Sequence, residues 1–212
     1  MRSGVMNRQP FGGRYAPFAG DLLTAVSVSP KVMTPPGAEV GDLLIACIRW
    51  ENVSAMTPAS GWTLISEAVM NANTHTIGTY WRVHGSESLQ EVFTIGSSIT
   101  WATMMVVCKH IDRINPIISV VKVEDITSDT PTWPAVTPGE KAVLVGVIGT
   151  VGGRHIVNPP PAWSRLSRGA ASTVSVVSKN TTVGPQATPT FTGLLSAVAI
   201  HSLQTIALRP AS

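Results

Sequence analysis

The sequence contains one short, almost continuously apolar run, Gly41-Asp42-Leu43-Leu44-Ile45-Ala46-Cys47-Ile48-Arg49-Trp50. The turn-forming residues Thr34-Pro35-Pro36-Gly37 stand just before it. A short apolar run that is bounded by turn residues is typical of a β-strand buried on both faces. We therefore expect a central buried strand over residues 42–50.

A weaker copy of this run, and of the segment that follows it, returns in the second half of the chain. Residues 58–65 follow the first run, and residues 138–147 and 161–166 repeat the pair. Trp62 and Trp163 lie at matching places in the two copies, although Gly61 precedes the first and Ala162 the second. The sequence therefore predicts a weak internal two-fold repeat, with halves at about residues 21–123 and 138–210.

Other segments with β-branched residues or a period of two extend this plan. The expected strands cover residues 22–28, 42–50, 62–70, 74–84, 91–95, 99–111, 117–123, 142–150, 163–168, 172–179, 188–191 and 194–208. Frequent strands with no capped, amphipathic helix between them predict an all-β, antiparallel β-sandwich, jelly-roll-like in its connections. We expect a single domain over residues 21–212, built as one sandwich or as two small ones, after an extended N-terminal arm over residues 1–20.

The composition has an unusually low share of charge. Only 13% of the 212 residues are charged, whereas about a quarter is usual in a soluble globular domain. Either much of the surface is covered by partners, or the surface is rich in Ser and Thr. The N-terminus lacks the apolar segment of a signal peptide, and no apolar run is long enough for a membrane-spanning helix. Without a secretory context, Cys47 and Cys108 are predicted to be buried free thiols.

The net charge of +3 comes from the N-terminal arm, because no acidic residue precedes Asp21. So small an excess argues against nucleic-acid binding, which needs a dense basic patch. The arm also carries aromatic side chains, which are costly to leave in water. The arm is either disordered or docked, and we favour docking on an acidic or polar partner surface. The candidate docking residues are Arg2, Arg8, Phe11, Arg14, Tyr15 and Phe18.

The histidines and cysteines show no catalytic or zinc-binding motif. None of the five histidines lies in the sequence context of a nucleophile and its base. His110 and His201 are expected to be core or rim residues, and His75 and His84 to be solvated. No Cys or His residues have the spacing of zinc ligands. We therefore expect no enzyme activity, no catalytic residue, no metal site and no cofactor.

One acidic cluster, Glu124, Asp125 and Asp129, stands at the end of an expected strand. The favoured interpretation is a solvated turn. A Ca²⁺ site and a pair of catalytic carboxylates are weaker alternatives, because the spacing of a calcium-binding loop is absent.

The six tryptophans divide into two groups. Trp62 and Trp163 are expected to pack in the core, because they occupy matching places in the two copies. Trp133, between Pro131 and Pro134, is the candidate for an exposed aromatic. An exposed aromatic ring of this kind could stack on a sugar.

Several short motifs, in order, resemble a loose group of virion structural proteins of tailed bacteriophages and prophages. The resemblance covers roughly residues 22–210. Proteins of the group are described as minor tail, fibre-associated or capsid-decorating proteins, and they share no catalytic residues. The motifs are the Pro-x-Gly turn, Gly41-Asp42-Leu43-Leu44-Ile45-Ala46, Pro58-Ala59-Ser60-Gly61-Trp62-Thr63-Leu64-Ile65, Tyr80-Trp81-Arg82-Val83, Phe93-Thr94 and Ile206-Ala207-Leu208-Arg209-Pro210. The second half departs from the pattern, since Ala162 replaces the glycine before its tryptophan.

The resemblance implies a non-enzymatic structural protein of the virion, assembled in the cytoplasm of a bacterial host. Its partners would be capsid or tail subunits and further copies of itself, with no nucleic acid or membrane. Head decoration is the favoured role, because the chain is expected to be one domain without fibre repeats. The alternatives are a minor tail or tail-fibre component and a lectin-like module that binds host polysaccharide, with a glycan hydrolase as a weak third.

Overall fold

The structure is a computed structural model that describes residues 17–19, 23–52, 54–72, 74–86, 90–166, 174–179, 183–184, 186–188 and 190–212. Within these ranges every regular element is a β-strand, and every strand pairing is antiparallel. The prediction of an all-β, antiparallel β-sandwich is confirmed. The described residues contain no helix of the length and apolar character needed to cross a membrane.

The first large sheet comes from the first half of the chain. Its strand order is β1-β8-β4-β6-β5, and β2 also pairs with β8. The strands are β1 (Phe18–Ala19), β2 (Leu23–Ser27), β4 (Leu43–Glu51), β5 (Thr63–Met70), β6 (His75–Val83) and β8 (Ile99–Cys108). The apolar run that begins at Gly41 is thus the central strand β4, flanked by β8 and β6.

The second large sheet comes from the second half, with the order β13-β14-β11-β17-β9. Its strands are β9 (Ile117–Ser128), β11 (Val143–Thr150), β13 (Trp163–Arg165), β14 (Val174–Lys179) and β17 (Ala199–Leu208). The first lobe is defined here as strands β1 to β8, and the second lobe as strands β9 to β17.

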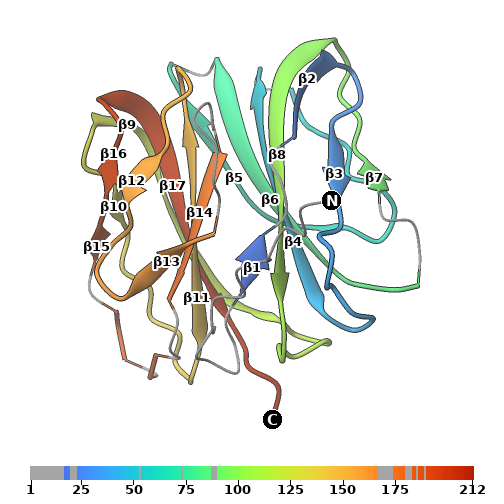
Figure 1. Cartoon of the computed structure of the whole chain (residues 1–212), viewed down its shortest axis with the longest axis vertical. Coiled ribbons are helices and arrows are strands. Elements are labelled where there is room, and N and C mark those ends of the chain that lie inside the picture. Colours follow the sequence, from blue (N-terminus) through green and yellow to red (C-terminus); the bar gives the residue numbers. More distant parts are fainter. Residues whose placement is uncertain are drawn as a thin grey trace, which may run out of the picture.

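Three two-stranded sheets form the outer layers of the molecule (Figure 1). The pair β3 (Lys31–Met33) and β7 (Gln90–Val92) lies outside the first large sheet. The pairs β10 (Thr132–Trp133) with β15 (Phe191–Thr192), and β12 (Ile156–Asn158) with β16 (Leu194–Leu195), lie outside the second. Each lobe is therefore a small sandwich, and the two sandwiches stack with their large sheets face to face.

Strand β4 shows why the sequence folds into stacked layers. Alternate residues of a strand point to opposite faces. Leu43, Ile45 and Cys47 pack in the core between the two large sheets, whereas Leu44 and Ile48 pack in the outer core of the first lobe. Both faces of the strand are buried, as its continuous apolar sequence predicts.

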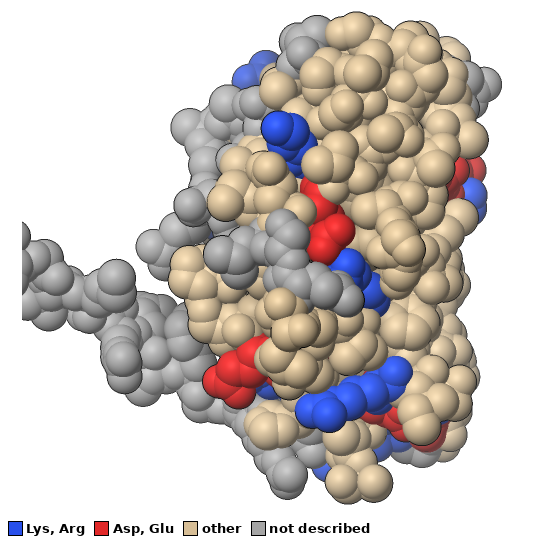
Figure 2. Space-filling view, turned by 90° about the vertical axis from the view of Figure 1, so that its right-hand side faces the viewer, with Lys and Arg blue, Asp and Glu red and all other residues tan. Residues whose placement is uncertain are grey.

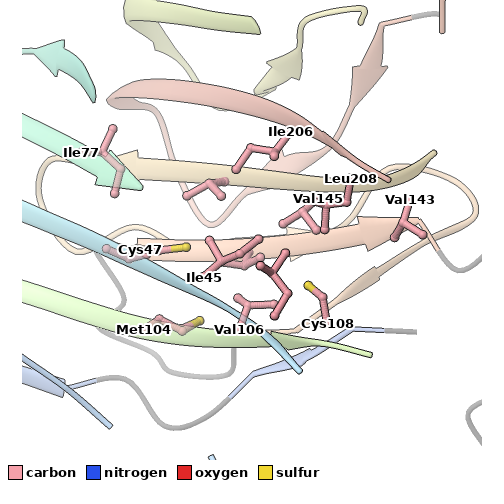
Figure 3. Close-up of a cluster of buried hydrophobic side chains, with 14 of the residues drawn as sticks. Ile45, Cys47, Ile77, Met104, Val106, Cys108, Val143, Val145, Ile206 and Leu208 are labelled. Carbon is pink, nitrogen blue, oxygen red and sulfur yellow. The ribbon is translucent and has the colours of Figure 1, made fainter. Parts of the chain in front are cut away.

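The core between the lobes is shown in Figure 3. Side chains of Ile45 and Val106 from the first lobe point toward Val145 and Ile206 from the second. Cys47 and Cys108 lie in the same core as free thiols, which confirms that prediction. Burial raises the pKa of both thiols, so both are held in the neutral form.

The two large sheets share one strand order. The order β8-β4-β6-β5 in the first lobe matches β17-β11-β14-β13 in the second. The registers also match: Leu43 lies opposite Cys108 in the first sheet, and Val143 lies opposite Leu208 in the second. A shared order is what a duplicated unit would produce, and the duplication itself stays a prediction.

A tight turn before β5 has a counterpart before β13. The Trp62 N–H donates to the Ala59 carbonyl at 3.2 Å, and the Trp163 N–H donates to the Pro160 carbonyl at 3.0 Å. The third residue of each turn has a positive φ, +82° at Gly61 and +65° at Ala162. This is the pattern of a type II turn, which favours glycine at that position. The one departure of the second copy, alanine for glycine, therefore falls at a position that is strained for alanine.

Polar bonds join the lobes inside the core. The Thr79 hydroxyl donates to Gln204 Oε1 at 2.6 Å, and Gln204 Nε2 donates to the Ile77 carbonyl at 3.2 Å. Gly149 of β11 brings the sheets close, because a Cβ at that position would lie 2.8 Å from Ile77 Cβ. The lobes are thus fitted to one another in one register.

Candidate functional site

The N-terminal arm contributes one described residue among its docking candidates. Phe18 lies in β1, opposite Val107 of β8, and packs against the outer core of the first lobe. The end of the predicted arm is therefore an edge strand of the sandwich. The remaining candidates, Arg2, Arg8, Phe11, Arg14 and Tyr15, lie outside the described residues.

The prediction that Trp133 is exposed is wrong. Its side chain is 0% exposed and packs in the outer core of the second lobe. The flanking prolines lead it into β10 rather than into an open loop. Gly146 makes room for the indole, because a Cβ there would lie 2.7 Å from Trp133 Nε1.

The other tryptophans are also packed into the protein. Trp62 and Trp163 are buried, as predicted from their matching places. Trp50 and Trp101 are buried, and Trp81 is partly buried. The exposed aromatic platform that a lectin-like site would use is therefore not found among the six tryptophans, all of which the structure describes.

The histidines are spread over the molecule. His201 is a core residue, as predicted, and its Nδ1 lies 3.0 Å from the Ala199 carbonyl oxygen. Burial lowers the pKa of His201, and that hydrogen bond partly opposes the shift. His110 lies just past β8, at the rim, and is exposed. The prediction that His75 and His84 are solvated is wrong, since His84 is buried and the His75 side chain is only 12% exposed.

The predicted acidic turn is part of a strand. Glu124 and Asp125 lie in β9, which continues to Ser128 because an irregularity in its pairing with β17 accommodates them. The Glu124 carboxylate accepts the Val69 N–H at 3.1 Å, and Asp125 accepts the Asn71 N–H at 2.6 Å. These carboxylates close the edge of β5 against β9, and they serve the fold.

The electrostatics of Glu124 fit that structural role. Burial raises its pKa, but the hydrogen bonds from the Lys122 ammonium and the Val69 N–H outweigh burial, so the net shift is downward. Lys122 also donates to the Glu67 carbonyl of β5 at 2.8 Å. The edge is thus held by side chains in place of a backbone ladder.

A groove of about 590 Å³ opens beyond the end of β8. It is formed by the turn before β4, the loop after β8 and the end of the chain. Backbone hydrogen bonds join these segments. The Ala211 N–H donates to the His110 carbonyl at 2.8 Å, and the Asp112 N–H donates to the Arg209 carbonyl at 2.9 Å. The lining residues are Glu39, Val40, Gly41, Asp42, Lys109, His110, Ile111, Asp112, Arg113, Ile114, Ala211 and Ser212.

Three carboxylates and two basic side chains surround the groove. Lys109 Nζ lies 2.8 Å from Glu39 Oε1 and 3.9 Å from Asp42 Oδ2. The hydrogen bond from Lys109 lowers the pKa of Glu39, and the bond to Glu39 raises the pKa of Lys109. Backbone N–H groups of Asn115 and Ile114 lower the pKa of Asp112. These hydrogen bonds favour the ionised form of Glu39 and Asp112.

Two apolar side chains stand exposed in the same lining. Val40 is 68% exposed and Ile114 is 82% exposed. Arg113 lies over Gly41, where a Cβ would collide with its guanidinium. Ionised carboxylates beside exposed aliphatic groups can bind a chain that carries both cationic and apolar side chains.

Sequence reasoning missed this groove. Residues 39–42 and 109–114 are distant in the sequence, and each resembles an ordinary charged loop. Only the pairing of β4 with β8 brings the two loops together.

Among the residues that the structure describes, no group of three or more His, Cys, Asp or Glu side chains could hold a metal ion. No protein-family model and no curated protein matches the chain.

Proposed function

We propose that this chain is a non-enzymatic structural subunit of a phage virion that binds neighbouring subunits, most favourably as a capsid decoration protein. The proposal joins the resemblance of its motifs to virion proteins with one observation, an apolar strip on the outer face of the first lobe. This outer strip consists of Val28, Met33 and Val92, which are 46%, 48% and 42% exposed.

The pairing of β3 with β7 places two of these side chains together. Val32 is buried in the outer core of its lobe and lies opposite Glu91. The neighbouring residues Met33 and Val92 therefore face outward, as diagonal cross-strand neighbours. The Ile95 N–H donates to the Val28 carbonyl at 3.0 Å, so the backbone at Val28 belongs to the same outer layer.

The outer strip lies among charged side chains: Lys31, opposite Val92 in the same strand pair, is exposed, and Glu91 of β7 forms an ion pair with Arg82. Figure 2 shows this side of the molecule, where Lys and Arg side chains and Asp and Glu side chains lie among larger neutral areas. Single exposed apolar residues are normal on soluble proteins, whereas a patch of neighbouring ones marks a contact surface. Exposed apolar side chains with charged groups around them suit a contact surface, in which an apolar centre is surrounded by a polar rim.

Quantitative mass spectrometry of purified particles tests the proposal. We expect the chain in particles, at a copy number comparable with that of the major capsid protein. A copy number far below that of the capsid protein would move the role to the tail. Absence of the chain from particles that contain all their other subunits would refute the virion role.

A pair of variants tests the outer strip. The double variant Met33→Asp with Val92→Asp places charge on an apolar contact, and we expect fewer copies of this variant than of the wild type on particles. The control is Val157→Asp, which changes a side chain of similar exposure (44%) on the opposite outer layer. Equal occupancy of both variants, with folding confirmed by thermal unfolding, would mean that the outer strip is not the contact.

A further inference from the structure

The N-terminal segment joins the molecule beside the groove. β1 runs antiparallel to β8, and Phe18 lies opposite Val107, close to the end of β8 at Cys108. Pro17, the first residue of the described part, therefore lies at the end of the sheet where Lys109 and the groove begin. Residues 1–16 start from this edge.

The segment is basic, whereas the groove has one more carboxylate than it has Lys and Arg side chains. Residues 1–16 contain Arg2, Arg8 and Arg14 and no acidic residue. The groove presents three carboxylates to two basic side chains. The segment also carries Phe11 and Tyr15, and the groove exposes aliphatic side chains that aromatic rings can cover.

The extended length of residues 1–16 is sufficient to contact the groove of a second molecule. An extended chain spans at most about 3.5 Å per residue, so residues 1–16 can reach about 55 Å and Arg8 can lie up to about 30 Å from Pro17. Such a reach allows the distal arginines to contact the groove of a facing molecule. Two molecules that face each other at this end could exchange their segments reciprocally.

We propose that the groove binds the N-terminal segment, residues 1–16, of a second copy of this chain. The inference rests on the proposed function in that copies lie side by side in an assembly. The carboxylates bind the arginines, and Val40 and Ile114 pack against the aromatic rings. Raising the ionic strength weakens such a contact, because exposed charges are screened.

Ile114 offers a matched pair of variants, because it is 82% exposed and changes there leave the core untouched. Ile114→Lys adds a cation against the basic segment, and Ile114→Glu adds an anion. We expect self-association of the full chain, measured by sedimentation velocity, to weaken about fivefold in the first and to strengthen about fivefold in the second. Val198→Lys, at another exposed site (59%), should change nothing. Equal association of the two Ile114 variants would overturn the proposal.

A photo-crosslinker in place of Phe11 locates the segment directly. Full-length chains with light and heavy isotopes are mixed, irradiated and mapped by mass spectrometry. Adducts that join a light segment to heavy residues 39–42 or 109–114 support the proposal. Adducts confined to one copy, or adducts outside the groove, overturn it. Particle copy number is measured separately, so loss of segment exchange is distinguished from loss of the virion role.

Discussion

The turns before β5 and β13 give a sharp prediction, because they differ at one position. Gly61 and Ala162 both have positive φ, +82° and +65°. Left-handed backbone costs a residue with a Cβ about 1–2 kcal/mol, whereas glycine adopts it freely. We expect Ala162→Gly to stabilise the protein and Gly61→Ala to destabilise it.

The size of the effect follows from two opposing contributions. Relief of strain contributes about 1–2 kcal/mol, and the greater freedom of glycine in the unfolded chain costs about 0.5–1 kcal/mol. The net gain for Ala162→Gly is about 0.5–1 kcal/mol, with a similar loss for Gly61→Ala. No atom lies within 4 Å of a Cβ built on Gly61, so packing contributes nothing to that change.

Chemical denaturation and thermal unfolding measure both variants. For a protein of this size the expected shift in Tm is about 1–4 °C, upward for Ala162→Gly and downward for Gly61→Ala. Gly96→Ala is the control, since Gly96 has open space and no positive φ. In Gly96→Ala only the smaller conformational entropy of the unfolded chain changes, so this variant should be slightly more stable than the wild type. A destabilised Ala162→Gly variant, or a Gly61→Ala variant that behaves like Gly96→Ala, would refute the strain argument.

Three further predictions concern the contact between the lobes. Gln204→Ala should destabilise the protein by about 1–3 kcal/mol, because it removes two buried hydrogen bonds between the lobes, to the Thr79 hydroxyl and the Ile77 carbonyl. An unchanged denaturation midpoint would contradict this. Gly149→Ala should lower the free energy of unfolding by about 1–3 kcal/mol, because the added Cβ would overlap with Ile77. A melting temperature equal to that of the wild type would show that the two sheets can move apart without cost. The pKa of Glu124 is lowered in the folded state, so the ionised carboxylate stabilises the fold above the usual pKa of 4.5, and this contribution is lost as the pH falls through the folded pKa. Glu124→Gln should therefore lower the free energy of unfolding by at most about 0.5 kcal/mol at pH 7 and by almost nothing at pH 3. A larger loss at pH 3 than at pH 7 would contradict this.

The fold class was predictable because short apolar runs, alternating apolar and polar residues and turn residues mark the strands locally in the sequence. The apolar run from Gly41 to Trp50 became the central strand β4, with alternate residues packed in two different cores. Matching tryptophans pointed to matching turns, and the structure places Trp62 and Trp163 in such turns. Local sequence carries this information because strand burial and turn geometry depend on near neighbours.

Features that depend on distant pairing were not predictable. Trp133 was expected outside because prolines flank it, yet the space over Gly146 decides its burial. The predicted strand over residues 117–123 ends before Glu124, whereas β9 continues to Ser128. The Glu124 carboxylate accepts a hydrogen bond from Val69 in the other lobe, a contact that local sequence does not show. The groove unites two loops that only the pairing of β4 with β8 brings together.

If the proposed function is right, this two-lobed sandwich is a virion subunit that packs through the outer face of its first lobe. A cryo-electron microscopy map of the intact particle tests it most directly. We predict two stacked sandwiches at each of many equivalent positions, with the outer strip of Val28, Met33 and Val92 covered by a neighbouring subunit. A map with every position filled by other chains, or one in which this face is open to solvent in every copy, would contradict the claim.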